Sequence, residues 1–188
     1  MSTELKELVA DLQRRMDGAL ESLRRDFSGL RSGRASPNLL EPVRVEVYGS
    51  VVPLSQVGSV AVPEARMLTV SVWDRSVVGA VEKAIRDSGL GLNPASEGQT
   101  IRVPIPQLTE ERRNELAKAA ARYAENARVA VRGVRRDGMD KAKSFEKKGD
   151  ISQDDLKSWS DSIQKLTDDY IGRVDKLLGE KERDIKQV

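Results

Sequence analysis

The chain has 188 residues, of which 33% are charged and only 4% are aromatic, and its formal net charge is +2. It contains no cysteine and no histidine, which excludes disulfides, Cys/His zinc sites, thiol nucleophiles and imidazole acid–base catalysis. No apolar run approaches the length of a membrane span, and the charged N-terminus does not resemble a secretory signal. This composition favours a cytoplasmic protein built on long helices.

Residues 1–30 are predicted to form one long helix. Its apolar residues recur at alternating intervals of mostly three and four, which places them on one stripe, as in a helical bundle: Leu5, Val9, Leu12, Met16, Ala19, Leu23, Phe27 and Leu30. The segment RSGRASP follows. Gly33 tolerates unusual backbone dihedrals and Pro37 cannot continue a helical ladder, so we expect the helix to end here.

From about Glu41 the apolar period changes to two. The segments VRVEVYG and LTVSVWD alternate apolar and polar residues and are rich in β-branched side chains, so they are predicted to be strands. The segment SVVGAVEKAIRDSGLG predicts a short helix, and TIRVPIP predicts a last strand that ends in two prolines. Tyr48 and Trp73 fall on the strand pattern and are expected to be structural. Residues 41–106 are therefore expected to form a compact β/α/β unit.

Helical spacing resumes after this unit. Thr109 is expected to cap a second long helix, whose stripe contains Leu116, Ala120, Tyr123, Ala127, Ala130 and Val134. KKGDIS interrupts the pattern, and Ser152 with Asp155 resembles a capping box that opens a third helix. The stripe of this third helix contains Trp159, Ile163, Leu166, Tyr170, Val174 and Leu177. Three such amphipathic helices predict a three-helix bundle.

The predicted fold class is therefore α+β with two domains. Residues 1–30 and 107–188 form a discontinuous three-helix bundle, and residues 31–106 form the inserted β/α/β domain. The chain leaves and re-enters the bundle through two short links, near residues 31–37 and 104–107. Two adjacent links favour a hinge, because few contacts need to cross it. Firm packing of the small domain onto the bundle is the alternative that the sequence leaves open.

The positive charge is concentrated in one segment. Residues 107–149 carry 12 basic and 7 acidic side chains, a net charge of +5, whereas the whole chain has +2. Within ARVAVRGVRRD, an α-helix would place four arginines within about one quadrant, with Lys143 on the same side: Arg128, Arg132, Arg135 and Arg136. We expect them on an outer ridge, roughly opposite the apolar stripe that includes Ala127 and Ala130.

Two interpretations of this ridge remain open on the residues alone. It is either an ordinary solvated helix face or a surface that binds phosphate through the planar guanidinium groups. No acidic residue between Arg128 and Arg136 supplies a partner at four-residue spacing, and Gly133 weakens the helix there. The ridge has no aromatic side chains on which bases could stack, so structured RNA fits better than splayed single strands.

No other pattern predicts chemistry. Carboxylate pairs such as Asp154–Asp155 and Asp168–Asp169 are expected by chance at this charge density, so no metal site is predicted. The glycines of GLGLNP lack the spacing of a dinucleotide or phosphate loop. We therefore expect no catalytic residue, no cofactor and no enzyme activity. A helical module that binds other proteins is the alternative, and it would require an exposed apolar patch.

Six motifs in order resemble one family. RSGRASP, DRS, VEKAI, LGLNP, IRVPIPQLTEERR and ARVAVRGVRRD together resemble the ribosome recycling factors of bacteria and organelles. The resemblance extends over essentially the whole chain. It implies an L-shaped molecule that binds the post-termination ribosome. With elongation factor G, and GTP hydrolysis on that partner, it would split the ribosomal subunits without chemistry of its own.

The resemblance also implies roles for particular residues. Arg132 and Arg135 match the arginines with which the family contacts RNA of the large ribosomal subunit, and Arg128 and Arg136 share their ridge. Arg31 and Arg34 match the hinge motif, with Arg31 expected to contact RNA. The expected hinge residues are Gly33, Arg34, Pro104 and Pro106. The expected partners are the large subunit, its RNA and elongation factor G, with no membrane, and the chain is expected to be a monomer.

Overall fold

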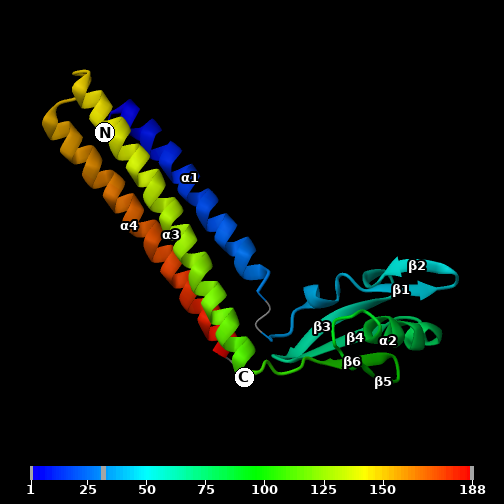
Figure 1. The fold of residues 1–188 in the computed structure, drawn as a ribbon. Helices are drawn as coiled ribbons and strands as arrows, with labels where there is room; N and C mark the ends of the chain where they lie inside the picture. Colours follow the sequence, from blue (N-terminus) through cyan, green and yellow to red (C-terminus); the bar gives the residue numbers. More distant parts are fainter. Residues whose placement is uncertain (1, 31–32, 187–188) are drawn as a thin grey trace. The chain divides into compact units, whose positions relative to one another are not determined.

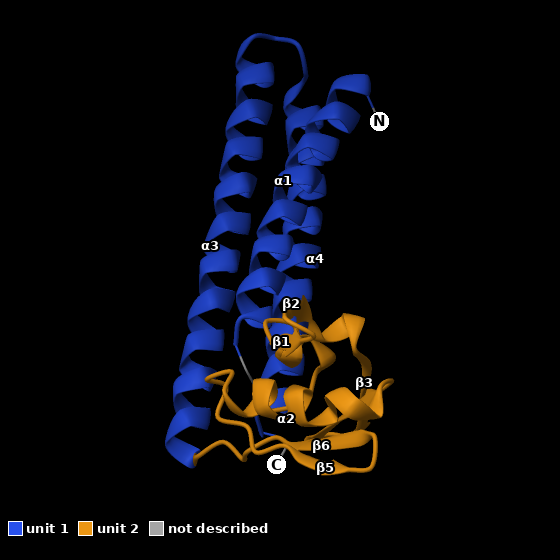
Figure 2. Cartoon of the chain, turned by 90° about the vertical axis from the view of Figure 1, so that its right-hand side faces the viewer, with its two compact units in different colours: residues 1–32, 110–187 blue, residues 33–109, 188 orange. Residues whose placement is uncertain are grey.

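The computed structural model describes residues 2–30 and 33–186. The chain divides into two compact units, one from residues 1–32 and 110–187 and the other from residues 33–109. We call them the bundle unit and the small unit (Figure 2). The predicted α+β class is confirmed, with a β-containing segment inserted between helices of a bundle.

Three long helices lie side by side in the bundle unit, and each contacts the other two (Figure 1). They are α1 (Thr3–Ser28), α3 (Glu110–Lys147) and α4 (Gln153–Lys186). The capping box predicted for α4 is confirmed, because the Ser152 N–H donates to Asp155 Oδ2 at 3.1 Å and the Asp155 N–H donates to Ser152 Oγ at 3.0 Å. These bonds satisfy two donors that a helix start otherwise leaves unpaired.

The buried stripes follow the predicted period with local shifts. In α1, Leu8 and Leu20 are buried, whereas Val9, Ala19 and Leu30 are only half-buried. In α4, Thr167 is buried, and its hydroxyl donates to the Ile163 carbonyl at 2.8 Å. Leu166 and Leu177, predicted at the interior, are half-buried. The period alone could not choose between neighbouring apolar positions at the edge of a stripe.

The shift is larger in α3. Ala130, predicted to point inward, is exposed, and Val131 is buried in its place. Ala124 likewise takes the interior position assigned to Tyr123. Apart from leucine and valine, the buried positions of α3 are occupied by small residues: Ala120, Ala124, Ala127, Gly138 and Ala142. Because alanine occurs on both faces of this helix, hydrophobicity gave a weak signal for its orientation.

The small unit contains more strands than the sequence predicted. The three predicted segments contain β1 (Arg44–Val47), β4 (Met67–Val72) and β6 (Thr100–Pro104), and α2 (Val78–Arg86) is the predicted helix. The strands missed by the prediction are β2 (Ser50–Pro53), β3 (Gly58–Glu64) and β5 (Ala95–Glu97). Strands β1 and β2 form an antiparallel hairpin, and the other four form an antiparallel sheet in the order β3-β4-β6-β5.

The core of the small unit is aliphatic and largely β-branched. Val77, Val81 and Ile85 are buried in this core, and α2 contacts β1, β5 and β6. Tyr48 and Trp73, expected to be structural, lie outside this core, with side chains that are 81% and 63% exposed. Tyr48 occupies the hairpin turn at φ 49°, and its hydroxyl donates to Asp74 Oδ2 at 2.7 Å.

Candidate nucleic-acid interface

Helix α3 carries the four arginines of the candidate interface, Arg128, Arg132, Arg135 and Arg136, which we call the arginine face. Arg132 and Arg136 are exposed, whereas Arg128 and Arg135 are half-buried. The sequence predicted that this face lies opposite the apolar stripe, and that prediction is wrong. The arginine face begins beside α4 and turns outward, because the true interior is centred on Val131 and Val134.

The two half-buried arginines are held by α4. Arg128 donates from Nε and Nη2 to Asp175 Oδ1 at 3.0 and 2.7 Å, and Arg135 Nε donates to Gln164 Oε1 at 2.7 Å. The hydrogen bond to Asp175 raises the pKa of Arg128 above its ordinary value, against the effect of burial. These bonds fix two guanidinium groups in place.

Arg132 and Arg128 share a partner on their own helix. Glu125 accepts from Arg128 Nη1 at 3.1 Å and from Arg132 Nη1 at 3.2 Å, and these two hydrogen bonds lower its pKa below the ordinary value. Within the described residues, Arg136 forms no hydrogen bond or ion pair. The arginine face thus contains one outer arginine paired with a carboxylate and one presented directly to solvent.

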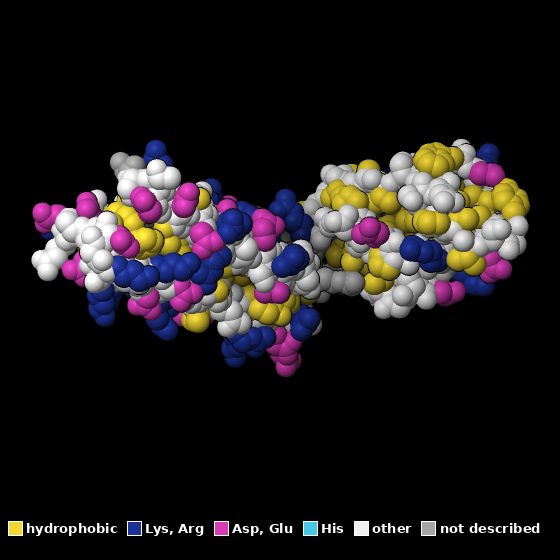
Figure 3. All heavy atoms as spheres, turned by 90° about the horizontal axis from the view of Figure 1, so that it is seen from above, with side chains coloured by type: hydrophobic (Ala, Val, Ile, Leu, Met, Phe, Trp, Pro, Cys, Tyr) yellow, Lys and Arg dark blue, Asp and Glu magenta, His cyan; other side chains and the backbone are white. Residues whose placement is uncertain are grey.

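In the described part of the chain, no large polar side chain covers the helix surface at Gly133 and Val129, which lie beside the outer arginines. A Cβ built on Gly133 would meet nothing within 4 Å, and Val129, one turn earlier, is 58% exposed. Lys and Arg lie among Asp and Glu over the bundle unit, as Figure 3 shows. A smooth helical surface with projecting guanidinium groups suits a phosphate backbone, since binding then needs no base-specific pocket.

The four predicted hinge residues, Gly33, Arg34, Pro104 and Pro106, all fall within the small unit. Gly33 has φ 76°, and a Cβ there would lie 2.9 Å from Leu108 Cγ. Pro104 is the last residue of β6 and pairs with Met67, so it belongs to the sheet rather than to a link. Arg34 and Pro106 are exposed and lie outside helices and strands.

Backbone hydrogen bonds attach both ends of the inserted segment to the rest of the small unit. The Ala35 N–H donates to the Ala65 carbonyl at 2.7 Å, and the Ile105 N–H donates to the Arg66 carbonyl at 2.9 Å. At the end of α1, Lys181 Nζ donates to the Leu30 carbonyl at 2.7 Å. Arg31, predicted to contact RNA, lies outside the described residues.

Sequence reasoning missed the partners of the arginines. Glu125 precedes Arg128 by three residues and Arg132 by seven, which are helix-neighbour spacings, so it could have been found. Asp175 and Gln164 lie 47 and 29 residues away from their arginines, and only the packing of α3 on α4 brings them close. No group of three or more acidic residues in the described ranges could hold a metal ion. No described helix has an apolar stretch long enough to cross a membrane.

Comparisons with known proteins agree on one family. The family model described as "Ribosome recycling factor" matches residues 23–185. The chain is 77% identical to the ribosome-recycling factor of Gluconobacter oxydans (strain 621H) and 76% identical to that of Gluconacetobacter diazotrophicus, each over 188 residues and 100% of both chains.

Two solved structures resemble the chain. A solution structure of the ribosome recycling factor is 42% identical, covers 100% of both chains and has a TM-score of 0.69. The other comes from models of the T. thermophilus ribosome recycling factor and E. coli elongation factor G bound to the E. coli post-termination complex. It is 46% identical, covers 97% of this chain and 99% of the other, and has a TM-score of 0.63.

Proposed function

Because the chain belongs to the ribosome recycling factor family, we propose that it binds the post-termination ribosome through RNA of the large subunit. With elongation factor G and GTP, it then promotes splitting of the subunits. A related structure was placed with elongation factor G on a post-termination complex, and curated relatives at 77% and 76% identity carry the recycling name. The single observation that carries the RNA contact is the arginine face.

The arrangement of the arginine face gives its members different roles in this proposal. Arg132 and Arg136, which are exposed, make the outer phosphate contacts. Arg128 and Arg135 extend the contact from positions fixed by Asp175 and Gln164. A fixed guanidinium group loses little side-chain entropy when it binds, so anchored arginines assist affinity.

Paired substitutions test this assignment. Arg132→Ala with Arg136→Ala should weaken binding to purified large subunits by about tenfold to a hundredfold, since two charge-assisted contacts are lost. The salt dependence should become shallower by about one unit of slope per lost phosphate contact. Both side chains are exposed, so thermal stability should stay nearly constant.

The matched control removes two exposed arginines from another helix. Arg14 and Arg24 lie on α1 with side chains that are 76% and 52% exposed. Their double alanine variant removes the same charge and should retain most of the affinity. Equal affinities of the two double variants and the original chain would remove the arginine face from the function.

We further propose that the small unit moves relative to the bundle unit about links at residues 31–34 and 106–109. The support is topological, because the chain passes between the two compact units only at these two places. Lys181 holds the bundle-unit end of the first link at Leu30. In this proposal the bundle unit binds RNA while elongation factor G displaces the small unit.

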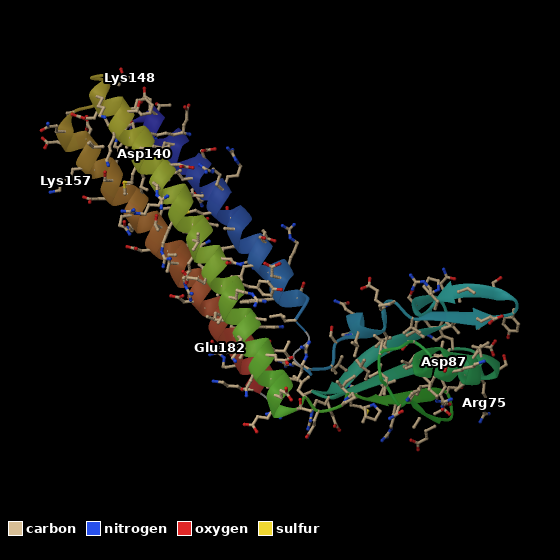
Figure 4. The ribbon with its side chains drawn as sticks, in the orientation of Figure 1. Arg75, Asp87, Asp140, Lys148, Lys157 and Glu182 are labelled. Carbon is tan, nitrogen blue, oxygen red and sulfur yellow. The ribbon has the colours of Figure 1, made fainter. Side chains whose placement is uncertain are left out.

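Fluorescence energy transfer tests the hinge, because the chain has no cysteine of its own. Labels at Lys157→Cys in α4 and Asp87→Cys at the end of α2 report on both units (Figure 4). Free chains should give a broad distribution of transfer efficiencies that narrows on the ribosome and shifts when elongation factor G and GTP are added. A single narrow distribution in all three states would contradict the hinge.

In this proposal the chain acts as a cytoplasmic monomer. It catalyses no reaction of its own. Subunit splitting should then require elongation factor G and GTP, and it should not occur with the chain alone. Light scattering of ribosomes with each component omitted in turn measures this requirement. Splitting by the chain alone would overturn this part of the proposal.

A further inference from the structure

Glu125 accepts hydrogen bonds from two arginines of the arginine face, and binding of RNA phosphates to these arginines has to break those bonds. Its two carboxylate oxygens are both used, with Oε2 accepting from Arg128 and Oε1 accepting from Arg132. A phosphate group offers arginine the same kind of paired oxygens. The carboxylate and an incoming RNA phosphate therefore compete for the same N–H donors.

We propose that Glu125 is an internal competitor of RNA that occupies Arg128 and Arg132 and limits the affinity of the arginine face for the ribosome. The inference rests on the proposed function, since it concerns how tightly that same surface binds. It assigns Glu125 a tuning role through competition, whereas the arginines make the contacts.

The bonding pattern shows which acidic residue would be displaced. Asp175 accepts from Nε and Nη2 of Arg128, on one edge of the guanidinium group, and Glu125 accepts only from Nη1. Displacing Glu125 therefore frees Nη1 while Arg128 stays anchored to α4. Phosphate binding needs no rearrangement of the bundle.

Exposure makes this competition reversible. The side chains of Glu125 and Arg132 are both 54% exposed, whereas that of Arg128 is 20% exposed. Exposed ion pairs contribute little and exchange readily. Glu125 can therefore yield to the closely spaced phosphates of ribosomal RNA. Isolated anions, which bring fewer simultaneous contacts, gain less from displacing it.

The opposite role for Glu125 predicts the opposite sign. If the carboxylate mainly held the two arginines in a productive orientation, its removal would weaken binding. If it competes, its removal strengthens binding. The sign of the affinity change in Glu125→Gln therefore decides between the two roles, and the glutamine keeps nearly the same size and helix propensity.

The matched control is Asp140, which lies on α3 one turn beyond Arg136 (Figure 4). It forms no ion pair among the residues that the structure describes. Asp140→Asn changes the net charge of α3 by the same amount without releasing an arginine. Comparing the two variants separates release of the arginines from a general change in charge.

Binding of the fluorescently labelled full-length chain to purified large ribosomal subunits provides the measurement. Glu125→Gln should bind about three- to tenfold more tightly at low salt, since two surface ion pairs no longer have to be broken. The gain should shrink at high salt because exposed charges are screened. Asp140→Asn should change the affinity less than twofold.

Two results would overturn the inference: an affinity of Glu125→Gln at or below that of the original chain, or a gain no larger than that of Asp140→Asn. The Arg132→Ala, Arg136→Ala variant separates this failure from failure of the proposed function. If that variant binds weakly and Glu125→Gln does not tighten binding, only the internal competitor is wrong. If it binds normally, the arginine face and the competitor both fail.

Discussion

The two units bury their interiors in different ways. Small residues line much of α3, so that Gly138 lies directly against Leu12 of α1, and charged side chains cover the outside of the bundle. The small unit instead packs valines, leucines and isoleucines between α2 and its strands. Over the face in Figure 3 it shows larger hydrophobic areas than the bundle unit.

Because of this difference, the two units expose different kinds of side chain to other molecules. In the bundle unit, the small inner residues of α3 face larger buried side chains of α1 and α4, such as Leu12 and Tyr170, and charged residues, including the arginine face, lie on the outside. The small unit leaves apolar side chains outside, with Tyr48, Val51 and Trp73 each more than 60% exposed. The exposed surface is therefore mainly charged over the bundle unit and partly apolar over the small unit.

The largest expected effects come from core truncation, which tests whether the two interiors are independent. Leu12 and Leu68 are both fully buried, one in each unit. Replacing either by alanine should lower the free energy of unfolding of its own unit by about 2–5 kcal/mol. Hydrogen exchange should show lost protection in residues 3–28 and 110–186 for Leu12→Ala, and in residues 33–109 for Leu68→Ala.

The control for this pair is a solvent-facing substitution in each unit, such as Lys157→Ala and Arg75→Ala, which should leave exchange unchanged. Equal loss of protection in both units after either core substitution would mean that they unfold as one. The separation of the chain into two independent units would then be wrong.

The sequence predicted the long helices well for a physical reason. A stripe that persists over many turns is a strong signal, and the capping box at Ser152 and Asp155 marked the start of α4. Prediction failed where the signal was short or ambiguous. Strands β2 and β5 span only four and three residues, and Ala130 was placed inside because alanine does not distinguish the faces of α3.

The candidate site was predictable in part. The clustering of four arginines on one side of α3 follows from helical geometry. Their bonding to Asp175 and Gln164 depends on how α4 packs, which no local pattern contains. Likewise, the proline pattern marked Pro104 as a hinge residue, but its pairing with Met67 in the sheet is a long-range contact.

The bundle unit contains a buried tyrosine, Tyr170, which should make the stability of this unit sensitive to alkaline pH. Burial, and then the adjacent Asp17, raise the pKa of Tyr170 to about 12, from 10.0. The folded state holds this proton more tightly, so the stabilisation is complete below pH 10 and is lost as the pH rises to 12. The loss should be about 2–3 kcal/mol.

Denaturant unfolding followed by helical circular dichroism at pH 9 to 12 measures this effect. The stability difference between the original chain and Tyr170→Phe should shrink by about 2–3 kcal/mol over this range, because phenylalanine cannot ionise. Tyr123→Phe, at a half-buried position, is the control and should show no such change. A difference for Tyr170→Phe that stays constant with pH would contradict the assignment.

The smallest expected effects concern two glycines on α3, one facing the interior and one facing solvent. A Cβ on Gly133 meets nothing within 4 Å, whereas a Cβ on Gly138 would lie 2.5 Å from Leu12 Cδ1. Gly138→Ala should therefore cost about 1–3 kcal/mol through overpacking. Gly133→Ala should stabilise the bundle by about 1 kcal/mol through helix propensity.

Combining substitutions identifies the cause of the cost at Gly138. If crowding by Leu12 is responsible, Gly138→Ala should become neutral or stabilising in a Leu12→Ala background, and the two changes should couple by about 1–3 kcal/mol in a double-mutant cycle. Gly18→Ala on α1, where a Cβ also meets nothing within 4 Å, should behave like Gly133→Ala. Additive effects of Leu12→Ala and Gly138→Ala would show that crowding by Leu12 does not cause the cost of Gly138→Ala.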